Sequence, residues 1–236
     1  MTGGKKPPFD PRGRRRGPKV KVKAGKGRST SSRRWLERHL NDPYVAEARR
    51  LGYRSRAAFK LRELDARFAL LKDARRILDL GAAPGGWTQV AVASCPRAHI
   101  VALDILPMEP VAGAAVLCAD FLAENTETIL IEALSGPADL VLSDMAPAST
   151  GHKATDALRT MALCEAALDF AEKVLRPGGH FVAKVMRGGT DHVLLARMRQ
   201  VFAEVKHAKP PSSRAESSEW FVIAKGYRRE DKAPLE

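Results

Sequence analysis

A lysine interrupts an apolar run in the C-terminal part of the sequence. Residues 178–189 read GGHFVAKVMRGG, and within them the strand-like run FVAKVM is apolar except at Lys184. An ammonium group buried without a partner costs several kcal/mol, so a lysine at such a position has a partner or a chemical task. A lysine that has lost its proton can act as a general base, and a second cation in the same desolvated cleft favours that loss. Lys184 is therefore the first candidate for a catalytic residue.

Carboxylates follow three other predicted strands. AHIVALDIL contains a strand that ends at Asp104, AAVLCADF one that ends at Asp120, and ADLVLSDMAP one that ends at Asp144. In an open parallel sheet the carboxyl ends of the strands meet at one edge, and ligands bind there. We therefore expect these side chains to share a ligand site, although a turn or a helix N-cap would give Asp120 or Asp144 a purely structural role.

A turn of small residues precedes these carboxylates. The sequence DLGAAPGGW lies between a short apolar strand and a helix that starts near Trp87, so its backbone can approach a ligand closely. Asp104 stands 19 residues after Gly85, near the distance at which such sites place an acid on ribose hydroxyls, and Asp120 could accept from an adenine amino group. The pattern predicts an adenosine-containing ligand, unless the turn is only a tight turn. Ala83 replaces the second glycine of GxGxxG, which counts against a nicotinamide dehydrogenase and favours a methyltransferase that uses S-adenosylmethionine.

Strands alternate with helices along most of the chain. Upstream of the small-residue turn, Ala58, Leu61, Leu64 and Phe68 recur at intervals of three and four and predict a helix. Further helices are predicted in ENTETILIEAL, in TDALRTMALCEAALDFAEKVL, which RPGG ends, and in TDHVLLARMRQVF. Two closing strands are predicted in EVKHAKP and EWFVIAKGY. This alternation predicts an α/β fold with a doubly wound, mostly parallel sheet.

The positive charge of the chain is concentrated at its N-terminus. The net charge of the 236 residues is +13, and residues 1–34 hold 13 Lys and Arg against the single acid Asp10, a net of +12. This segment is also rich in Gly and Pro, which predicts a disordered basic arm that contacts polyanionic nucleic acid. The predicted organisation is an arm over residues 1–34, a catalytic domain over residues 35–228 and a short polar tail over residues 229–236.

Composition also excludes several classes of protein. No stretch reaches the ~20 apolar residues of a membrane helix, so we expect a soluble, cytoplasmic protein and no membrane partner. Cys95, Cys118 and Cys164 form neither a CxxC pair nor a disulfide framework, and we expect three buried, reduced cysteines. No cluster of His, Cys and Asp has the spacing of metal ligands, so no metal is expected. A monomer is expected, because no long apolar face is evident.

Six motifs, taken in order, resemble those of the FtsJ/RrmJ (RlmE) family of ribosomal RNA ribose 2'-O-methyltransferases. They are SRAAFKL, LDLGAAPGGWTQ, DILPM, SDMAP, LRPGGHFVAKV and KPPSSRAESSEWFVIAKGY, and the resemblance runs from about Trp35 to Tyr227. It implies a Rossmann-like class I methyltransferase fold with a seven-stranded, mostly parallel sheet flanked by helices. It also implies that S-adenosyl-L-methionine is the cofactor.

The resemblance implies a catalytic tetrad and a cofactor site. The tetrad is Lys60 in AAFKL, Asp144 in SDMAP, Lys184 in FVAKV and Glu219 in SSEWF. Lys60 would help Lys184 to lose its proton, Asp144 would orient Lys184 and the departing methyl group, and Glu219 would fix Lys60 or the hydroxyl group. The implied cofactor-binding residues are Gly85, Trp87, Asp104, Asp120 and Asp144.

The implied substrate is a uridine ribose in large-subunit ribosomal RNA, on the assembled large ribosomal subunit. Aromatic and basic residues near the predicted cleft are candidates for RNA contacts: Tyr53, Arg54, Arg56, Arg187, Lys209 and Arg214. Two alternatives stay open. One is a 2'-O-methyltransferase that acts on transfer RNA or cap RNA, and the other is a non-catalytic RNA-binding factor for ribosome assembly.

Overall fold

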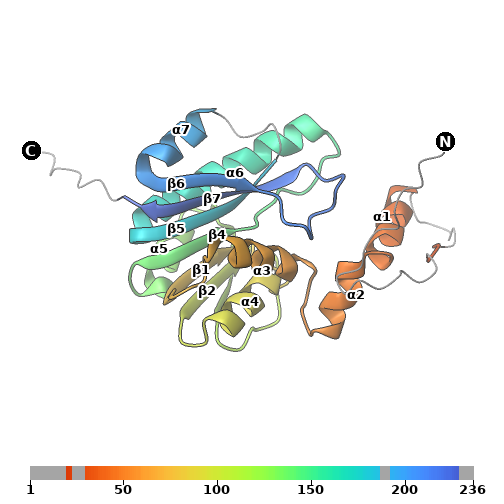
Figure 1. Cartoon of the computed structure of the whole chain (residues 1–236), viewed down its shortest axis with the longest axis horizontal. Helices are drawn as coiled ribbons and strands as arrows, with labels where there is room; N and C mark the ends of the chain where they lie inside the picture. The colour runs from red at the N-terminus through yellow and green to blue at the C-terminus, as the bar shows by residue number, and fades with distance from the viewer. Residues whose placement is uncertain (1–19, 23–29, 187–191, 229–236) are drawn as a thin grey trace, which may run out of the picture.

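A seven-stranded sheet with helices on both faces forms the centre of the computed structural model (Figure 1). The structure describes residues 20–22, 30–186 and 192–228. The strands are β1 (Arg76–Leu80), β2 (His99–Asp104), β3 (Ala115–Cys118), β4 (Ala138–Ser143), β5 (Leu175–Met186), β6 (Phe202–Ala208) and β7 (Glu219–Tyr227). The helices are α1 (Thr30–Leu40), α2 (Pro43–Arg50), α3 (Ala57–Phe68), α4 (Gly86–Ser94), α5 (Thr126–Leu134), α6 (Lys153–Val174) and α7 (His192–Val201).

The order of the strands across the sheet is β3-β2-β1-β4-β5-β7-β6. The first five strands in this order pair in parallel, and β7 is antiparallel to both β5 and β6. The chain leaves β1 toward β2 on one side and later reaches β4 on the other, so the ends of β1, β2 and β4 form the switch point of a doubly wound sheet. The predicted fold class is confirmed.

Both faces of the sheet are buried, because alternate residues of the strands face different helices. Ile77 of β1 and Val182 of β5 pack in a cluster with residues of α3 and α4. Their neighbours Leu78 and Phe181 pack in a second cluster with residues of α5, α6 and α7. Burial of successive residues explains why these strands are continuous apolar runs in the sequence, and why a lysine among them is conspicuous.

The helical segment before the sheet follows the predicted spacing. All four residues that predicted a helix, Ala58, Leu61, Leu64 and Phe68, are buried on α3. The preceding helix α2 begins at Pro43, with Asp42 as its N-cap accepting a hydrogen bond from the backbone N–H of Tyr44 at 3.0 Å. Figure 1 shows α1 and α2 beside the sheet, on the side of the N-terminus.

The predicted boundary of the basic arm stays a prediction, because most of the arm lies outside the described residues, as does the predicted tail over residues 229–236. Helix α1 begins at Thr30, within the range assigned to the arm. Val20 exchanges two hydrogen bonds of 2.8 Å with the side chain of Asn41, and the N–H of Val22 donates to Glu37 on α1 at 3.0 Å. Residues 20–22 therefore lie against the first helix.

Three details of the strand boundaries differ from the sequence predictions. RPGG lies within β5 instead of between the helix and the strand, because α6 ends at Val174 and β5 begins at Leu175, with a register shift against β4 near Ala138. Strand β3 ends at Cys118 and β4 at Ser143, so Asp120 and Asp144 follow their strands instead of ending them.

The prediction of three buried cysteines was wrong for Cys118, which is exposed. Its strand β3 is the edge of the sheet and has only one neighbouring strand to cover it. In the part of the chain that the structure describes, no helix combines the length and the apolar character that crossing a membrane requires.

Candidate active site

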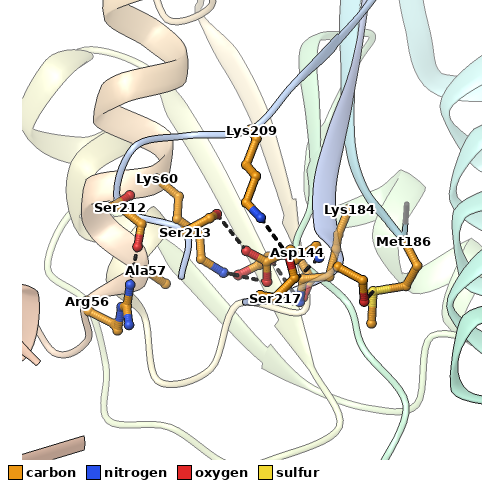
Figure 2. A network of polar contacts seen from close by, with 12 residues as sticks. Arg56, Ala57, Lys60, Asp144, Lys184, Met186, Lys209, Ser212, Ser213 and Ser217 are labelled. Carbon is orange, nitrogen blue, oxygen red and sulfur yellow. Dashed lines mark hydrogen bonds and ion pairs between the residues drawn. The ribbon is translucent and has the colours of Figure 1, made fainter. Parts of the chain in front are cut away.

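The four side chains of the implied tetrad meet beyond the carboxyl ends of β4 and β5. Asp144 directly follows β4, Lys184 is third from the end of β5, and Lys60 lies in the first turn of α3. Glu219 opens β7 and pairs with Met186, the last residue of β5, because the two strands are antiparallel. Figure 2 shows Lys60, Asp144 and Lys184 pointing toward one another.

The strand period explains the direction of Lys184. Side chains two residues apart on a strand share a face, so Lys184 faces the same side as Val182, which packs beneath α3 and α4. Its cross-strand partner Phe221 belongs to the same cluster, and the ring of Phe221 lies 5.6 Å from the Nζ of Lys60. The lysine that interrupts the apolar run is therefore aimed at the helix that carries the second lysine.

The tetrad forms a chain of alternating charges. Nζ of Lys184 lies 2.8 Å from Oδ1 of Asp144 and also donates to the backbone carbonyl of Asp144 at 2.7 Å. Nζ of Lys60 donates to Oε2 of Glu219 at 2.8 Å and lies 3.8 Å from Oδ2 of Asp144. Asp144 thus stands between the two lysines, and each lysine has a carboxylate at hydrogen-bonding distance.

The electrostatics keep Lys60 and Asp144 charged at neutral pH. Burial lowers the pKa of Lys60, but the carboxylates of Asp144 and Glu219 outweigh burial, and the net pKa lies above the ordinary value of 10.5. Burial raises the pKa of Asp144, but the ammonium groups of Lys184 and Lys60 outweigh it, and the net pKa lies below 3.8. Lys60 is therefore a fixed positive charge beside the carboxylate that holds Lys184.

Glu219 is held by residues that the sequence reasoning missed. Oγ of Ser213 donates to Oε1 of Glu219 at 2.9 Å, so both carboxylate oxygens of Glu219 have partners. The neighbouring Ser212 is fixed to α3, because its N–H and its hydroxyl group donate to Oε2 of Glu63 at 2.8 and 2.6 Å. Glu63 is 149 residues from Ser212, and only its place three residues after Lys60 on a helix could have suggested this role.

The second group of predicted residues lies at the ends of β1 and β2. Asp104 is the last residue of β2; its Oδ2 accepts from the N–H of Ala83, and its Oδ1 from the N–H of Leu106, both at 2.8 Å. Asp120 is exposed, and its Oδ1 accepts from the N–H of Leu122 at 3.0 Å. Asp104 is thus bonded to the small-residue turn, and Asp120 borders the same edge of the sheet from the loop after β3.

The small-residue turn adopts backbone conformations that only glycine tolerates. Gly81 has a φ of +74°, and a Cβ at this position would lie 2.6 Å from the backbone nitrogen of Met145, the residue after Asp144. Gly85 is the left-handed N-cap of α4 with a φ of 106°. The side chain of Trp87 is only 2% exposed, and its indole N–H donates to the carbonyl of Ala57 at 2.9 Å, so Trp87 could contact a ligand only through its backbone.

This edge of the sheet has the carboxylates and apolar side chains that an adenosine-containing cation requires. Ribose hydroxyl groups can donate to carboxylates, and Asp104 and Asp120 lie at the ends of neighbouring strands. Ile105 and Leu106, which follow Asp104, are each 62% exposed and can cover an adenine ring. The acidic groups Asp104 and Asp144 flank the end of β1 and suit a positively charged ligand. The residues present therefore fit S-adenosylmethionine.

Most of the predicted RNA-contacting residues are bonded within the protein. The guanidinium group of Arg56 contacts Asp42 and the carbonyl of Ser212, and that of Arg214 lies 3.3 Å from Asp42. Lys209 donates to the carbonyls of Ala215 and Ser217, and Arg54 donates to three carbonyls in two loops. Tyr53 packs edge-on against Phe59, and Arg187 lies outside the described residues. These contacts do not test RNA binding, which stays a prediction for each residue.

The topology and the site together define a class of enzyme. A doubly wound sheet with an antiparallel β7 between β5 and β6, and with an adenosine-type site at the ends of β1 and β2, is that of a class I methyltransferase that uses S-adenosylmethionine. The model of the FtsJ-like methyltransferase family matches residues 53–227, well over half of the chain. The chain therefore belongs to the FtsJ-like methyltransferase family.

Known proteins agree with this assignment. The chain is 57% identical over 212 residues to a protein of Rhizorhabdus wittichii named ribosomal RNA large subunit methyltransferase E. The alignment covers 90% of this chain and 93% of that protein. It is 58% identical over 210 residues to the Zymomonas mobilis protein of the same name, covering 89% and 95%. A crystal structure from Plasmodium falciparum described as a ribosomal RNA methyltransferase superposes with a TM-score of 0.66 at 29% identity, covering 74% of this chain and 98% of that one.

Proposed function

We propose that this enzyme transfers a methyl group to the 2'-hydroxyl of a uridine ribose in large-subunit ribosomal RNA, on the assembled large ribosomal subunit. The observation that carries the proposal is the pair of Lys184 and Asp144, partly buried beside Lys60 and Glu219 at the edge of the sheet where S-adenosylmethionine fits. The name that the curated relatives share, ribosomal RNA large subunit methyltransferase E, supports the choice of RNA. Uridine and the assembled subunit are expectations from the family resemblance.

The proposed chemistry is a direct methyl transfer. Bound S-adenosylmethionine supplies an electrophilic methyl group on a sulfonium sulfur. The bond from the ribose 2'-oxygen to the methyl carbon forms as the carbon–sulfur bond breaks, and the proton of the hydroxyl group passes to Nζ of Lys184. Lys184 can accept this proton only when it is neutral. Asp144 orients Nζ of Lys184 by its two contacts with that lysine, and Lys60 lies on the other side of the same carboxylate.

The other residues of the site have binding roles in this proposal. Asp104 would accept from the ribose hydroxyl groups of the cofactor, and Asp120 from its adenine amino group. Gly85 and Trp87 would contribute the backbone of the turn and of the first turn of α4, because the first N–H groups of a helix have no partner within the helix. Asp144 would border the cofactor and the acceptor ribose alike.

The substrate can be identified by a methyl-transfer assay with S-adenosylmethionine labelled on its methyl group. The acceptors are large ribosomal subunits from cells that lack the gene, the naked RNA of the same subunits, transfer RNA and capped RNA. We expect label in the subunits, and digestion to nucleosides should release it as 2'-O-methyluridine. Label on a base, or a preference for transfer RNA or capped RNA, would refute the substrate. Tight RNA binding without transfer to any acceptor would favour the assembly factor.

Replacing Glu219 with glutamine should lower kcat about 10- to 100-fold. The change removes the charge that holds Lys60, and the misplacement of a catalytic group by ~1 Å can cost about 10²-fold. Steady-state kinetics on large subunits measures the effect, and the KM for S-adenosylmethionine should change little. Glu216→Gln is the matched control, because Glu216 is an exposed carboxylate in the loop that leads into β7. A Glu219→Gln enzyme with the kcat of Glu216→Gln would contradict the role of Glu219.

Deleting residues 1–19 should weaken RNA binding and flatten its dependence on salt. The segment holds seven basic residues against Asp10, a net of +6, and the deletion keeps residues 20–22 that contact α1. The slope of log Kobs against log salt should become less negative by up to about 4, since each phosphate contact with a single strand contributes about 0.7. A full-length variant with these seven residues changed to serine separates charge from length. An unchanged slope in both variants would exclude residues 1–19 as an RNA contact.

A further inference from the structure

One arginine cross-links the two loops that border the proposed cofactor site. The guanidinium group of Arg54 donates through Nη1 to the carbonyls of Pro84 at 3.3 Å and Glu109 at 2.5 Å, and through Nη2 to the carbonyl of Pro110 at 2.7 Å. Pro84 belongs to the small-residue turn between β1 and α4. Glu109 and Pro110 belong to the loop that follows Asp104. No carboxylate pairs with Arg54 among the contacts of the described residues, so its donors serve backbone carbonyls.

The position of Arg54 is itself fixed on the turn side. A Cβ at Gly85 would lie 3.0 Å from Nη1 of Arg54, so the absence of a side chain at Gly85 leaves the room that the guanidinium group uses. The N–H of Arg54 donates to Oε1 of Gln89 on α4 at 2.8 Å, and Nε2 of Gln89 donates to the carbonyl of Gly52 at 3.0 Å. Helix α4 therefore holds the segment from which Arg54 reaches across to the second loop.

The second loop depends on such an anchor. Residues 105–110 have no helix or strand, and Ile105 and Leu106, the side chains that could cover an adenine ring, are exposed in it. At one end Asp104 bonds the loop to the turn through Ala83. At the other end Arg54 bonds it to the turn through Pro84. These two links hold the two loops together at the edge of the sheet where the cofactor is proposed to bind.

We propose that Arg54 is a positioning residue for cofactor binding, which holds the small-residue turn and the loop after Asp104 at the separation that adenosine needs. The inference deepens the proposed function, because it rests on the cofactor site proposed above. It assigns Arg54 a task other than the RNA contact that its place in the sequence suggested. A lysine cannot replace it, since one ammonium group cannot reach carbonyls on two loops in the way that the planar guanidinium fork does.

The test compares Arg54→Lys and Arg54→Ala with Arg49→Ala and Asp104→Ala in the full-length enzyme. Arg49 is an exposed arginine on α2, and its variant loses the same charge in the same region. Isothermal titration with S-adenosylhomocysteine should give a Kd raised at least 10-fold for both Arg54 variants and unchanged for Arg49→Ala. In steady state the KM for S-adenosylmethionine should rise at least 10-fold, with kcat at saturating cofactor and the KM for RNA within about threefold of the wild type.

Each outcome decides between the two assignments. Wild-type affinity for S-adenosylhomocysteine in Arg54→Lys, together with a weaker salt dependence of RNA binding, would overturn the proposal and make Arg54 a phosphate contact. A general loss of structure would raise both KM values and lower kcat in Arg54→Lys, which also counts against a positioning role. If Asp104→Ala binds S-adenosylhomocysteine normally while Arg54→Lys does not, the cofactor assignment of Asp104 fails and that of Arg54 stands. The reverse result refutes the role of Arg54 alone.

Discussion

The Lys184→Ala enzyme is expected to lose about 10²- to 10⁴-fold in kcat, the usual contribution of a positioned general base. The change removes the group proposed to take the proton from the ribose 2'-hydroxyl, and it leaves the edge of β1 and β2 untouched. The Kd for S-adenosylhomocysteine and the Kd for RNA should therefore stay within about threefold of the wild type. Single-turnover methyl transfer to large ribosomal subunits measures the chemical step directly.

A matched control makes this result specific to Lys184. Lys206→Ala removes an exposed lysine from strand β6, so it controls for the loss of one positive charge and should transfer methyl groups at the wild-type rate. If Lys184→Ala transfers methyl groups as fast as the wild type, another group is the base.

The second large effect concerns stability and belongs to Asp79, a fully buried carboxyl group on β1. Its Oδ2 accepts from the hydroxyl group of Thr88 at 2.7 Å, and its buried Oδ1 has no hydrogen-bond partner among the described residues. Burial raises the pKa of Asp79 from 3.8 to about 7, because the Thr88 hydrogen bond that opposes it is weaker and Asp144 and Asp104 add to it. Between pH 3.8 and about pH 7, Asp79 is therefore protonated in the folded protein and ionised in the unfolded chain.

The sign of the pH dependence follows from this difference. Stability falls with rising pH wherever the folded state binds more protons, so the wild type should lose stability at this group from about pH 4 to about pH 7 and no further above it. The asparagine of Asp79→Asn cannot titrate. The free energy of unfolding of this variant, relative to that of the wild type, should therefore rise by about 2–3 kcal/mol from pH 5 to pH 8. Urea unfolding of both proteins at several pH values measures this gain.

The exposed Asp73 provides the control for Asp79. Asp73→Asn makes the same chemical change at an exposed carboxyl group, so urea unfolding of this variant controls for the loss of one negative charge. A stability difference between Asp79→Asn and the wild type that does not change with pH would show that Asp79 is already ionised in the folded protein at pH 5.

The fold and Lys184 could be predicted from residue patterns, whereas the rest of the tetrad needed the family resemblance. Burial on both faces makes the strands of a parallel sheet readable as apolar runs, and the strand period then marks Lys184 as an exception. The resemblance supplied Lys60 and Glu219, whose types alone fit a solvated helix face and an edge strand. That they share an ion pair depends on the antiparallel pairing of β5 and β7, which no local pattern encodes.

Contacts between distant loops were beyond prediction for the same reason. The bonds of Glu63 to Ser212 and of Arg54 to Glu109 join segments 149 and 55 residues apart. A basic residue beside a cleft has the same sequence signature whether it binds phosphate or a backbone carbonyl. Cys118 was misjudged because an apolar segment does not reveal that its strand lies at the edge of the sheet.

The place of β7 has a consequence for the newly made chain. This strand lies between β5 and β6 although it is the last of the three to be synthesised, and it brings Glu219 to Lys60, 159 residues after that lysine. At translation rates of about 5–20 residues per second, this interval lasts on the order of 10–30 s. By the end of this interval the residues proposed to bind the cofactor and three of the four tetrad residues have been made, and Glu219, which hydrogen-bonds to Lys60, is the last to appear. The proposed tetrad is thus complete only after residue 219 has been synthesised, late in the translation of the enzyme.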